Sequence, residues 1–255
     1  MTIETHDNYS GDVAKFWTQK KDQFTVIGDY LGRLPSLELL NPAKGMKVLD
    51  AGCGAGFVTR MLARSGAQTY GCDASSTMLK SARASERAEP FGIRYGKADI
   101  TKRLPYGDDS FDAVITTGVL IHLSPEECLL FFCEARRVLK TGGRLVLSVT
   151  HYDLHLFGES LPTDADIWIR HERAGDNDLG DSCQYREYYR DMSCNLFESL
   201  VWAHPGHVLI DALTACGFDI VKEQAMFVTS EVLQKTGQKG TVGIPSHLQI
   251  LAQKR

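Results

Sequence analysis

The chain has 255 residues, of which 43% are hydrophobic and 24% are charged, and its formal net charge is −4. This length and composition are typical of one large folded domain, or of one domain with a cap. The acidic balance argues against a protein that coats nucleic acid or an anionic membrane. No apolar run reaches the roughly 18–20 residues of a membrane span, and the polar N-terminus is unlike a secretory signal. We therefore expect a cytoplasmic monomer or homodimer without nucleic-acid or membrane partners.

Seven cysteines are present, an odd number, and none of them forms a CxxC pair. No Cys/His cluster has the spacing of a zinc site. We therefore expect reduced thiols and no bound metal, as is usual for cytoplasmic proteins.

The predicted elements alternate between strand and helix along most of the chain. Residues 10–32 have the pattern of an amphipathic helix. Strands are expected at 47–52, 68–75, 93–100, 111–118, 144–151, 218–228 and 247–255, and helices at 57–66, 76–88, 124–143 and 207–217. Short apolar strands separated by helices predict a parallel sheet covered on both faces. In such folds ligands bind beyond the carboxyl ends of the strands.

Two helices carry clear end signals. Ser75 or Ser76 is expected to cap the helix over 76–88. Ser124 and Glu127 predict a capping box for the helix over 124–143, and Gly142 is expected to end it.

The alternation stops at 152–206, a stretch rich in Tyr, His, Asp and Arg. It is too long for a plain connection, so we read it as a cap inserted over the strand ends. A disordered linker is the alternative, which aromatic residues such as Trp168, Tyr185 and Trp202 disfavour.

Glycines at 52, 54 and 56 separate the first strand from its helix, so backbone amides there can face a ligand. Asp50 lies at the end of that strand. Asp73, about twenty residues on, can accept the hydroxyls of a ribose. Glycine turns that bind nothing are also common. A dinucleotide fingerprint would need a small residue at 57, where Phe57 stands, which counts against a nicotinamide or flavin coenzyme.

Five motifs, "VLDAGCGAGFVTR", "YGCDASSTML", "GKADI", "FDAVITTGVLIHL" and "ARRVLKTGGRLVLSV", resemble those of class I S-adenosylmethionine-dependent methyltransferases. The nearest subgroup is the small-molecule type 11, which includes quinone-biosynthesis enzymes. The resemblance implies a Rossmann-like α/β fold with a seven-stranded, mostly parallel sheet, an antiparallel last strand and helices on both faces. It divides the chain into a helical lid (1–40), a cofactor-binding core (41–151), the cap (152–206) and the rest of the sheet (207–255).

The resemblance also assigns residues to S-adenosylmethionine. The expected cofactor-binding set is Asp50, Gly52, Cys53 and Gly54 near the methionine part, Asp73, Ala74 and Met78 at the ribose, Asp99 and Ile100 at the adenine, Thr116, Thr117 and Gly118 at the methyl group, and Trp17 in a lid with Tyr9 or Phe16. Core packing of Phe16 and Trp17 is an equal alternative.

Methyl transfer from a sulfonium is an in-line displacement that mainly requires alignment of the acceptor. A general base is needed only when the acceptor arrives protonated. His122, His151 and His204 are the candidate proton acceptors, because they follow strands or lie near the cap. For His122 a hydrogen bond at a helix entry is the alternative. Tyr152, Tyr188 and Tyr189 are the candidate substrate-binding residues; the alternative for 184–191 is a solvated amphipathic segment.

Residues 164–191 contain eight acidic residues against four arginines. An acidic cap attracts a cation, so we expect N-methylation of a small polar amine or amino-acid-like metabolite. The alternatives are simply exposed charges, O- or C-methylation of an aromatic or quinone-like metabolite, and a non-catalytic cofactor-binding relative. Methylation of nucleic acid is disfavoured because "NPPY" is absent after the fourth strand.

Overall fold

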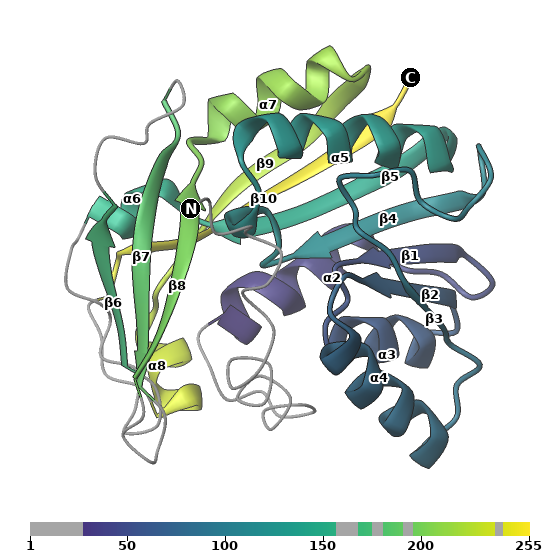
Figure 1. The fold of residues 1–255 in the computed structure, drawn as a ribbon, viewed down its shortest axis with the longest axis horizontal. Helices are drawn as coiled ribbons and strands as arrows, with labels where there is room; N and C mark the ends of the chain where they lie inside the picture. The colour runs from purple at the N-terminus through teal and green to yellow at the C-terminus, as the bar shows by residue number, and fades with distance from the viewer. Residues whose placement is uncertain (1–27, 157–167, 175–180, 191–195, 238–241) are drawn as a thin grey trace.

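The computed structural model describes residues 28–156, 168–174, 181–190, 196–237 and 242–255, which form a seven-stranded sheet with helices and a separate three-stranded sheet (Figure 1). Most of the helix expected over 10–32 lies outside the described residues, as do Tyr9, Phe16 and Trp17. The described part of that region begins with η2, a π-helix over Asp29–Arg33, followed by α2 over Leu34–Leu40.

The large sheet has the strand order β3-β2-β1-β4-β5-β10-β9. The strands are β1 (Lys47–Ala51), β2 (Gln68–Asp73), β3 (Arg94–Lys97), β4 (Phe111–Thr117), β5 (Leu139–Thr150), β9 (Phe218–Phe227) and β10 (Pro245–Lys254). Strands β1 to β5 are parallel to their neighbours, whereas β10 runs antiparallel to both β5 and β9. The expected sheet with an antiparallel last strand is therefore confirmed.

Helices cover both faces of this sheet. Helices α5 (Pro125–Val138) and α7 (Gly206–Ala215) lie on one face, and α2, α3 (Phe57–Arg64) and α4 (Ser76–Ala88) lie on the other (Figure 1). The strands are apolar on both sides because each face packs against helices. Each fully buried Leu, Val or Phe contributes about 1.5–3 kcal/mol, so both layers are needed to hold the sheet.

The predicted caps are confirmed, but one boundary is wrong. Ser75 caps α4, and Ser124 forms a capping box with Glu127 at the start of α5. Helix α5 ends at Val138 rather than at Gly142, because Leu139 is fully buried and already pairs with Phe111 of β4. The pairing shifts between 139 and 144, so the glycine-containing segment belongs to an irregular start of β5.

The segment after β5 forms α6 (Tyr152–Leu156) and a three-stranded antiparallel sheet of β6 (Trp168–Arg173), β7 (Cys183–Arg190) and β8 (Leu196–Ala203). Figure 1 shows this sheet beside the carboxyl ends of the parallel strands. Tyr185 of β7 and Val201 of β8 are buried in the same hydrophobic core as α5 and β5. A further helix, α8 (Ser230–Thr236), follows β9 and was not expected from the sequence.

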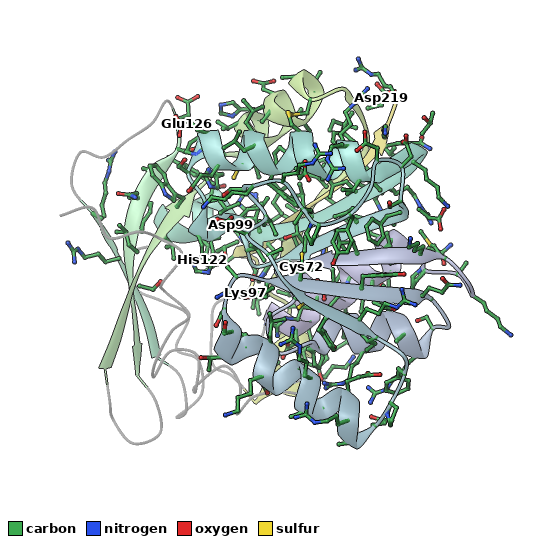
Figure 2. The ribbon with its side chains drawn as sticks, turned by 45° about the vertical axis from the view of Figure 1, so that its right-hand side comes forward. Cys72, Lys97, Asp99, His122, Glu126 and Asp219 are labelled. Atoms are coloured by element: carbon green, nitrogen blue, oxygen red, sulfur yellow. A yellow bond between two sulfur atoms is a disulfide. The ribbon has the colours of Figure 1, made fainter. Side chains whose placement is uncertain are left out.

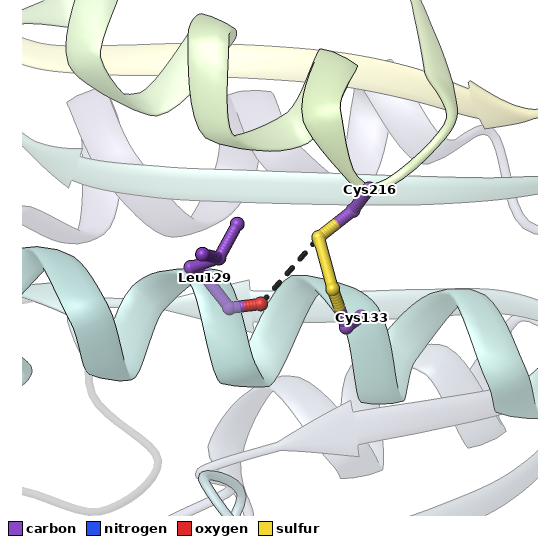
Figure 3. The surroundings of a disulfide bond; sticks show 3 residues. All are labelled: Leu129, Cys133 and Cys216. Atoms are coloured by element: carbon purple, nitrogen blue, oxygen red, sulfur yellow. Dashed lines mark hydrogen bonds between the residues drawn. A yellow bond between two sulfur atoms is a disulfide. The ribbon is translucent and has the colours of Figure 1, made fainter.

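The expectation that all cysteines are reduced is wrong. Cys133 of α5 and Cys216 at the end of α7 form a disulfide across 83 residues of sequence (Figure 3). Spacing in the sequence gives no sign of it, because only the packing of α5 against α7 brings the two residues together. The Cys216 Sγ also lies 3.5 Å from the Leu129 carbonyl, which accepts a hydrogen bond only from a reduced thiol (Figure 3).

Candidate functional site

The turn after β1 contains three glycines with positive φ: 76° at Gly52, 53° at Gly54 and 86° at Gly56. A Cβ on Gly52 would overlap the Val119 side chain beyond β4, and one on Gly56 would overlap the Tyr95 hydroxyl. Glycine is therefore required both for the backbone conformation and for the close packing of this turn against its neighbours.

Three amides of the glycine turn are bonded inside the protein. Gly52 and Cys53 donate to the Cys72 carbonyl at 2.8 and 2.9 Å, and Gly54 donates to Asp73 Oδ2 at 2.8 Å. These three amides therefore donate within the protein, and the binding of a ligand at this turn stays a prediction. Parallel strands β1 and β2 end at the same edge of the sheet. The Cys72 carbonyl and the Asp73 carboxylate of β2 therefore lie within hydrogen-bond distance of the turn amides. The absent Cβ atoms of Gly52, Gly54 and Gly56 let the turn pack closely against Val119, Met78 and Tyr95.

Asp73 is held rigidly at the end of β2. Its Oδ1 accepts from the Ser75 amide at 2.8 Å while Oδ2 accepts from Gly54. Burial raises the pKa of Asp73, although the two amide bonds act in the opposite direction. Each carboxylate oxygen has a second acceptor site, so the residue can still bind the hydroxyls of a sugar.

The other residues expected around a nucleoside gather at the same edge. The Met78 Cε lies 3.1 Å from the place that a Cβ on Gly54 would take, and Ala74 lies between β2 and α4. Asp99 follows β3, which ends at Lys97, and its Oδ1 accepts from the amide and hydroxyl of Thr101. Figure 2 shows Asp99 and His122 at the end of the sheet that faces the three-stranded sheet, with Asp219 at the opposite end.

Asp50 is a buried carboxyl beneath the glycine turn. It is 1% exposed and accepts a hydrogen bond of 2.6 Å from the Thr59 hydroxyl. Burial, together with the negative charge of Asp73, raises the pKa of Asp50 to about 7. The nearby cation Arg33 acts in the opposite direction. Burial likewise raises the pKa of Cys53, so its thiol is not a nucleophile at neutral pH.

The end of β4 carries the segment expected near the methyl group. Thr116 is fully buried, and its hydroxyl has no hydrogen-bond partner among the residues that the structure describes. Thr117 is half-buried, and Gly118 is exposed with a φ of 68°. The Gly118 amide donates to the Ser148 carbonyl at 2.9 Å, which ties this segment to β5. Ile100 is buried nearby in the core cluster.

His204 has no exposed surface. Its Nε2 lies 3.1 and 2.9 Å from the carbonyls of Leu120 and Leu123, and its Nδ1 lies 3.0 Å from the Ser182 hydroxyl. Burial lowers the pKa of His204, so the ring is neutral. Both nitrogens are engaged, which favours a role in joining β8 to the turn after β4 over contact with a substrate.

The other acceptor-side candidates lie nearer the open edge. His122, in the short 3₁₀-helix η3 (Leu120–His122), is 9% exposed. His151 follows β5 and is half-buried, and its Nδ1 accepts from the Asp153 amide at 3.2 Å. The Tyr152 hydroxyl lies 3.5 Å from Cys183 Sγ.

Tyr188 and Tyr189 are consecutive residues of β7, where they pair with Glu198 and Phe197 of β8.

Sequence reasoning missed two residues beside this edge, Arg33 and His247. His247 is the third residue of β10, and its Nδ1 lies 2.8 Å from the Ser246 hydroxyl. Burial lowers the pKa of His247 to about 4, and the neighbouring Arg33 and His151 act in the same direction. No local motif marks either residue, because their proximity depends on the pairing of β10 with β5.

The seven-stranded sheet with its antiparallel last strand and helices on both faces is a Rossmann-like α/β fold, which solved methyltransferase structures share. Residues 49–147 match the family model described as a methyltransferase domain, in agreement with the motifs of the sequence.

Two curated relatives are similar to this chain. Demethylmenaquinone methyltransferase from Tropheryma whipplei is 34% identical over 150 residues, which cover 56% of this chain and 60% of the relative. The mitochondrial ubiquinone biosynthesis O-methyltransferase of Mus musculus is 33% identical over 113 residues, or 43% and 30% of the two chains. The chain thus spans less than two thirds of the length of these relatives.

A solved structure supports the fold assignment over the whole length. Magnesium protoporphyrin IX methyltransferase from Synechocystis, with bound S-adenosylmethionine, aligns with 100% of this chain and 99% of its own. The TM-score is 0.63 at 16% identity. Within the described ranges, no helix combines the length and apolar character that a bilayer crossing requires.

Proposed function

We propose that the protein transfers a methyl group from S-adenosylmethionine to a small-molecule acceptor. The observation that carries this proposal is Asp73, which is fixed by the Gly54 and Ser75 amides at the end of β2, beside the glycine turn. A sugar edge bound by this carboxylate brings the rest of the nucleoside against Met78 and the sulfur end toward Gly118. The residues present therefore fit the cofactor.

S-adenosylmethionine supplies an activated methyl group on a cationic sulfur. The chain's own task is to align the acceptor atom with that methyl group, and such positioning can contribute about 7–11 kcal/mol. Residues 116–118 border this point from β4, and His151 and His247 border it from β5 and β10. Imidazole rings at this edge can take a proton from an acceptor that arrives protonated.

For the acceptor atom we propose the oxygen, or a carbon activated by oxygen, of a hydroxylated aromatic molecule. The neutral ring of His247 favours such a group, because it can accept the hydroxyl proton. Both relatives are named for quinone biosynthesis or a demethylated quinone, which supports the same class. N-methylation of a polar amine is the second candidate, favoured by the acidic residues between 164 and 191.

Formation of S-adenosylhomocysteine with a small acceptor panel tests both candidates. We expect product with catechol and with 1,4-dihydroxynaphthalene, and none with benzylamine. Product with benzylamine alone would replace the first candidate by the second. Tight binding of S-adenosylmethionine without product from any probe would instead support a non-catalytic cofactor-binding relative.

The cofactor site is tested separately by Asp73→Ala. Loss of charge-assisted hydrogen bonds to the sugar should cost about 1.5–3 kcal/mol, a roughly 10- to 150-fold rise in the dissociation constant of S-adenosylmethionine. Calorimetric titration measures this change. Asp219→Ala is the matched control, since Asp219 is an exposed carboxylate at the opposite end of the sheet (Figure 2). Equal affinities of the two variants would remove Asp73 from the site.

A further inference from the structure

We propose that His247 is a catalytic residue that binds the hydroxyl group of the methyl acceptor through Nε2. The inference rests on the proposed function, which supplies the methyl donor and the hydroxylated class of acceptor. It assigns to this site a residue that lies outside every motif recognised in the sequence.

Two glycines pack against the imidazole ring of His247. Gly28 and Gly32, one helical turn apart, face it from the η2 side. A Cβ on Gly32 would lie 2.9 Å from His247 Cδ2 and 3.1 Å from Nε2, and one on Gly28 would lie 3.7 Å from Nε2. Since Gly32 lacks a positive φ, backbone conformation does not require glycine there. The requirement comes from the ring.

The ring is anchored at one nitrogen only. Nδ1 lies 2.8 Å from the hydroxyl of Ser246, which is 1% exposed. Among the described residues, no hydrogen-bond partner meets Nε2, and the ring is only half-buried. When Nδ1 carries the proton and donates it to Ser246, the lone pair of Nε2 is available to a ligand.

The position of the ring matches that of an acceptor opposite the methyl group. Gly118 is bonded to Ser148, and His247 pairs with Thr150, two residues further along β5. The charge of Arg33 acts on the pKa values of both Asp50 and His247, so its guanidinium lies within electrostatic range of each. The pairing of β10 with β5 thus brings His247 to the edge of the sheet at which Gly118 lies, although the two residues are far apart in the sequence.

A second polar group next to the ring lacks a partner. Ser148 is 1% exposed, and its hydroxyl has no hydrogen-bond partner in the described part of the chain. It lies 3.4 Å from the same point at which a Cβ on Gly32 would meet the His247 ring. A buried hydroxyl without a partner is unfavourable, and a polar ligand at this place can offset its cost.

The charges around the ring keep it neutral. Arg33, ion-paired with Asp29 on η2, and His151 after β5 face His247 and together with burial lower its pKa. A neutral ring accepts a hydrogen bond from the acceptor hydroxyl over the whole range above about pH 5.

The proposed step is balanced. The hydroxyl oxygen donates a lone pair to the methyl carbon, and the carbon–sulfur bond breaks with its electron pair remaining on sulfur, which becomes neutral. The protonated ether so formed is a much stronger acid than an imidazolium, so its proton passes to Nε2 even though His247 is a weak base. The imidazolium then releases the proton to water.

Kinetics of His247→Asn test the assignment, with His207→Asn as the matched control because His207 is an exposed histidine on α7. With catechol as the acceptor, we expect kcat/KM to fall at least tenfold in His247→Asn and to stay unchanged in His207→Asn. The dissociation constant of S-adenosylhomocysteine should stay within twofold in both variants. Unchanged kcat/KM in His247→Asn would overturn the proposal.

A spectroscopic measurement distinguishes direct contact of His247 with the acceptor from a purely structural role of this residue. In wild-type protein saturated with S-adenosylhomocysteine, the ¹⁵N signal of His247 Nε2 should shift on addition of catechol, and that of His207 should not. Gly32→Ala, which moves the ring without changing it, should reduce the shift. Turnover of catechol with no shift would overturn the assignment alone. Failure of the wild type to turn over either hydroxylated probe would overturn the proposed function and this inference with it.

Discussion

The two halves of the site are assembled in different ways. On the cofactor side, the Gly54 amide bonds to Asp73, which is 19 residues away. On the proposed acceptor side, the side-chain amide of Gln249 in β10 donates to the Gly32 carbonyl of η2, which is 217 residues away. The cofactor half is thus the product of consecutive strand–helix–strand units, whereas the acceptor half joins the two ends of the described chain.

This difference explains which half the sequence reveals. A turn between a strand and its own helix fixes its geometry locally, so glycines and acids recur at readable spacings. The edge formed by η2, β5 and β10 depends only on the correct packing of each segment. Contacts between such distant segments produce no characteristic residue spacing in the sequence.

The largest expected effect concerns the cofactor half. In Gly52→Ala, the new Cβ overlaps Val119 at a backbone φ of 76°. Left-handed strain of about 1–2 kcal/mol and overpacking of about 1–3 kcal/mol should weaken binding of S-adenosylmethionine about 100-fold or more. Calorimetry measures the dissociation constant.

Gly92→Ala is the matched control for this strain. Gly92 has a φ of 78°, but a Cβ there would meet nothing within 4 Å. We expect a modest loss of stability and an unchanged dissociation constant. Equal losses of affinity in the two variants would show that backbone strain alone, and not the fit of the turn, governs binding.

The next effect concerns another contact between distant segments, the disulfide between α5 and α7. Cys133→Ser removes the link between α5 and α7, which closes 83 residues of chain. The free energy of unfolding should fall by about 2–4 kcal/mol, because the unfolded chain regains its freedom. Chemical unfolding with and without dithiothreitol measures this, and only the wild type should respond to the reductant. A wild type indifferent to reductant would contradict the contribution of the disulfide.

The smallest effect is a pH dependence within the cofactor half. The cationic groups of S-adenosylmethionine favour ionised Asp50, whose pKa in the free protein is about 7. Binding should therefore release a proton. Below that pKa, the affinity for S-adenosylmethionine should rise by up to about tenfold for each unit of increase in pH. Calorimetry from pH 5.5 to 8 checks this slope, and Asp50→Asn should flatten it. A wild-type slope of zero would place the cofactor's charges away from Asp50.

Asp50 and His247 give opposite pH dependences of the free energy of unfolding. The raised pKa of Asp50 contributes stability that is present below about pH 4 and lost as the pH rises through about 7. The lowered pKa of His247 contributes stability above its ordinary value of 6.5, and this is lost as the pH falls toward about 4. Unfolding of Asp50→Asn and His247→Asn across this range separates the two contributions.

Individual elements show where prediction from the sequence stopped. The capping box of α5 is readable because Ser124 and Glu127 act within one turn. The end of the same helix is misread, because burial of Leu139 against β4 outweighs the glycine signal at 142. The disulfide and the buried ring of His204 had no local signal at all.

By itself the sequence determined the parallel sheet and the place of the glycine turn, since these follow from hydrophobic periodicity and from residues within one strand–helix–strand unit. The antiparallel last strand was expected only from the resemblance of the motifs to a known family. Only the tertiary structure decided that the turn amides bind β2, that α5 and α7 are cross-linked, and that His247 pairs with the end of β5. Each of these depends on contacts between distant segments, whose geometry the packing of the whole sheet sets.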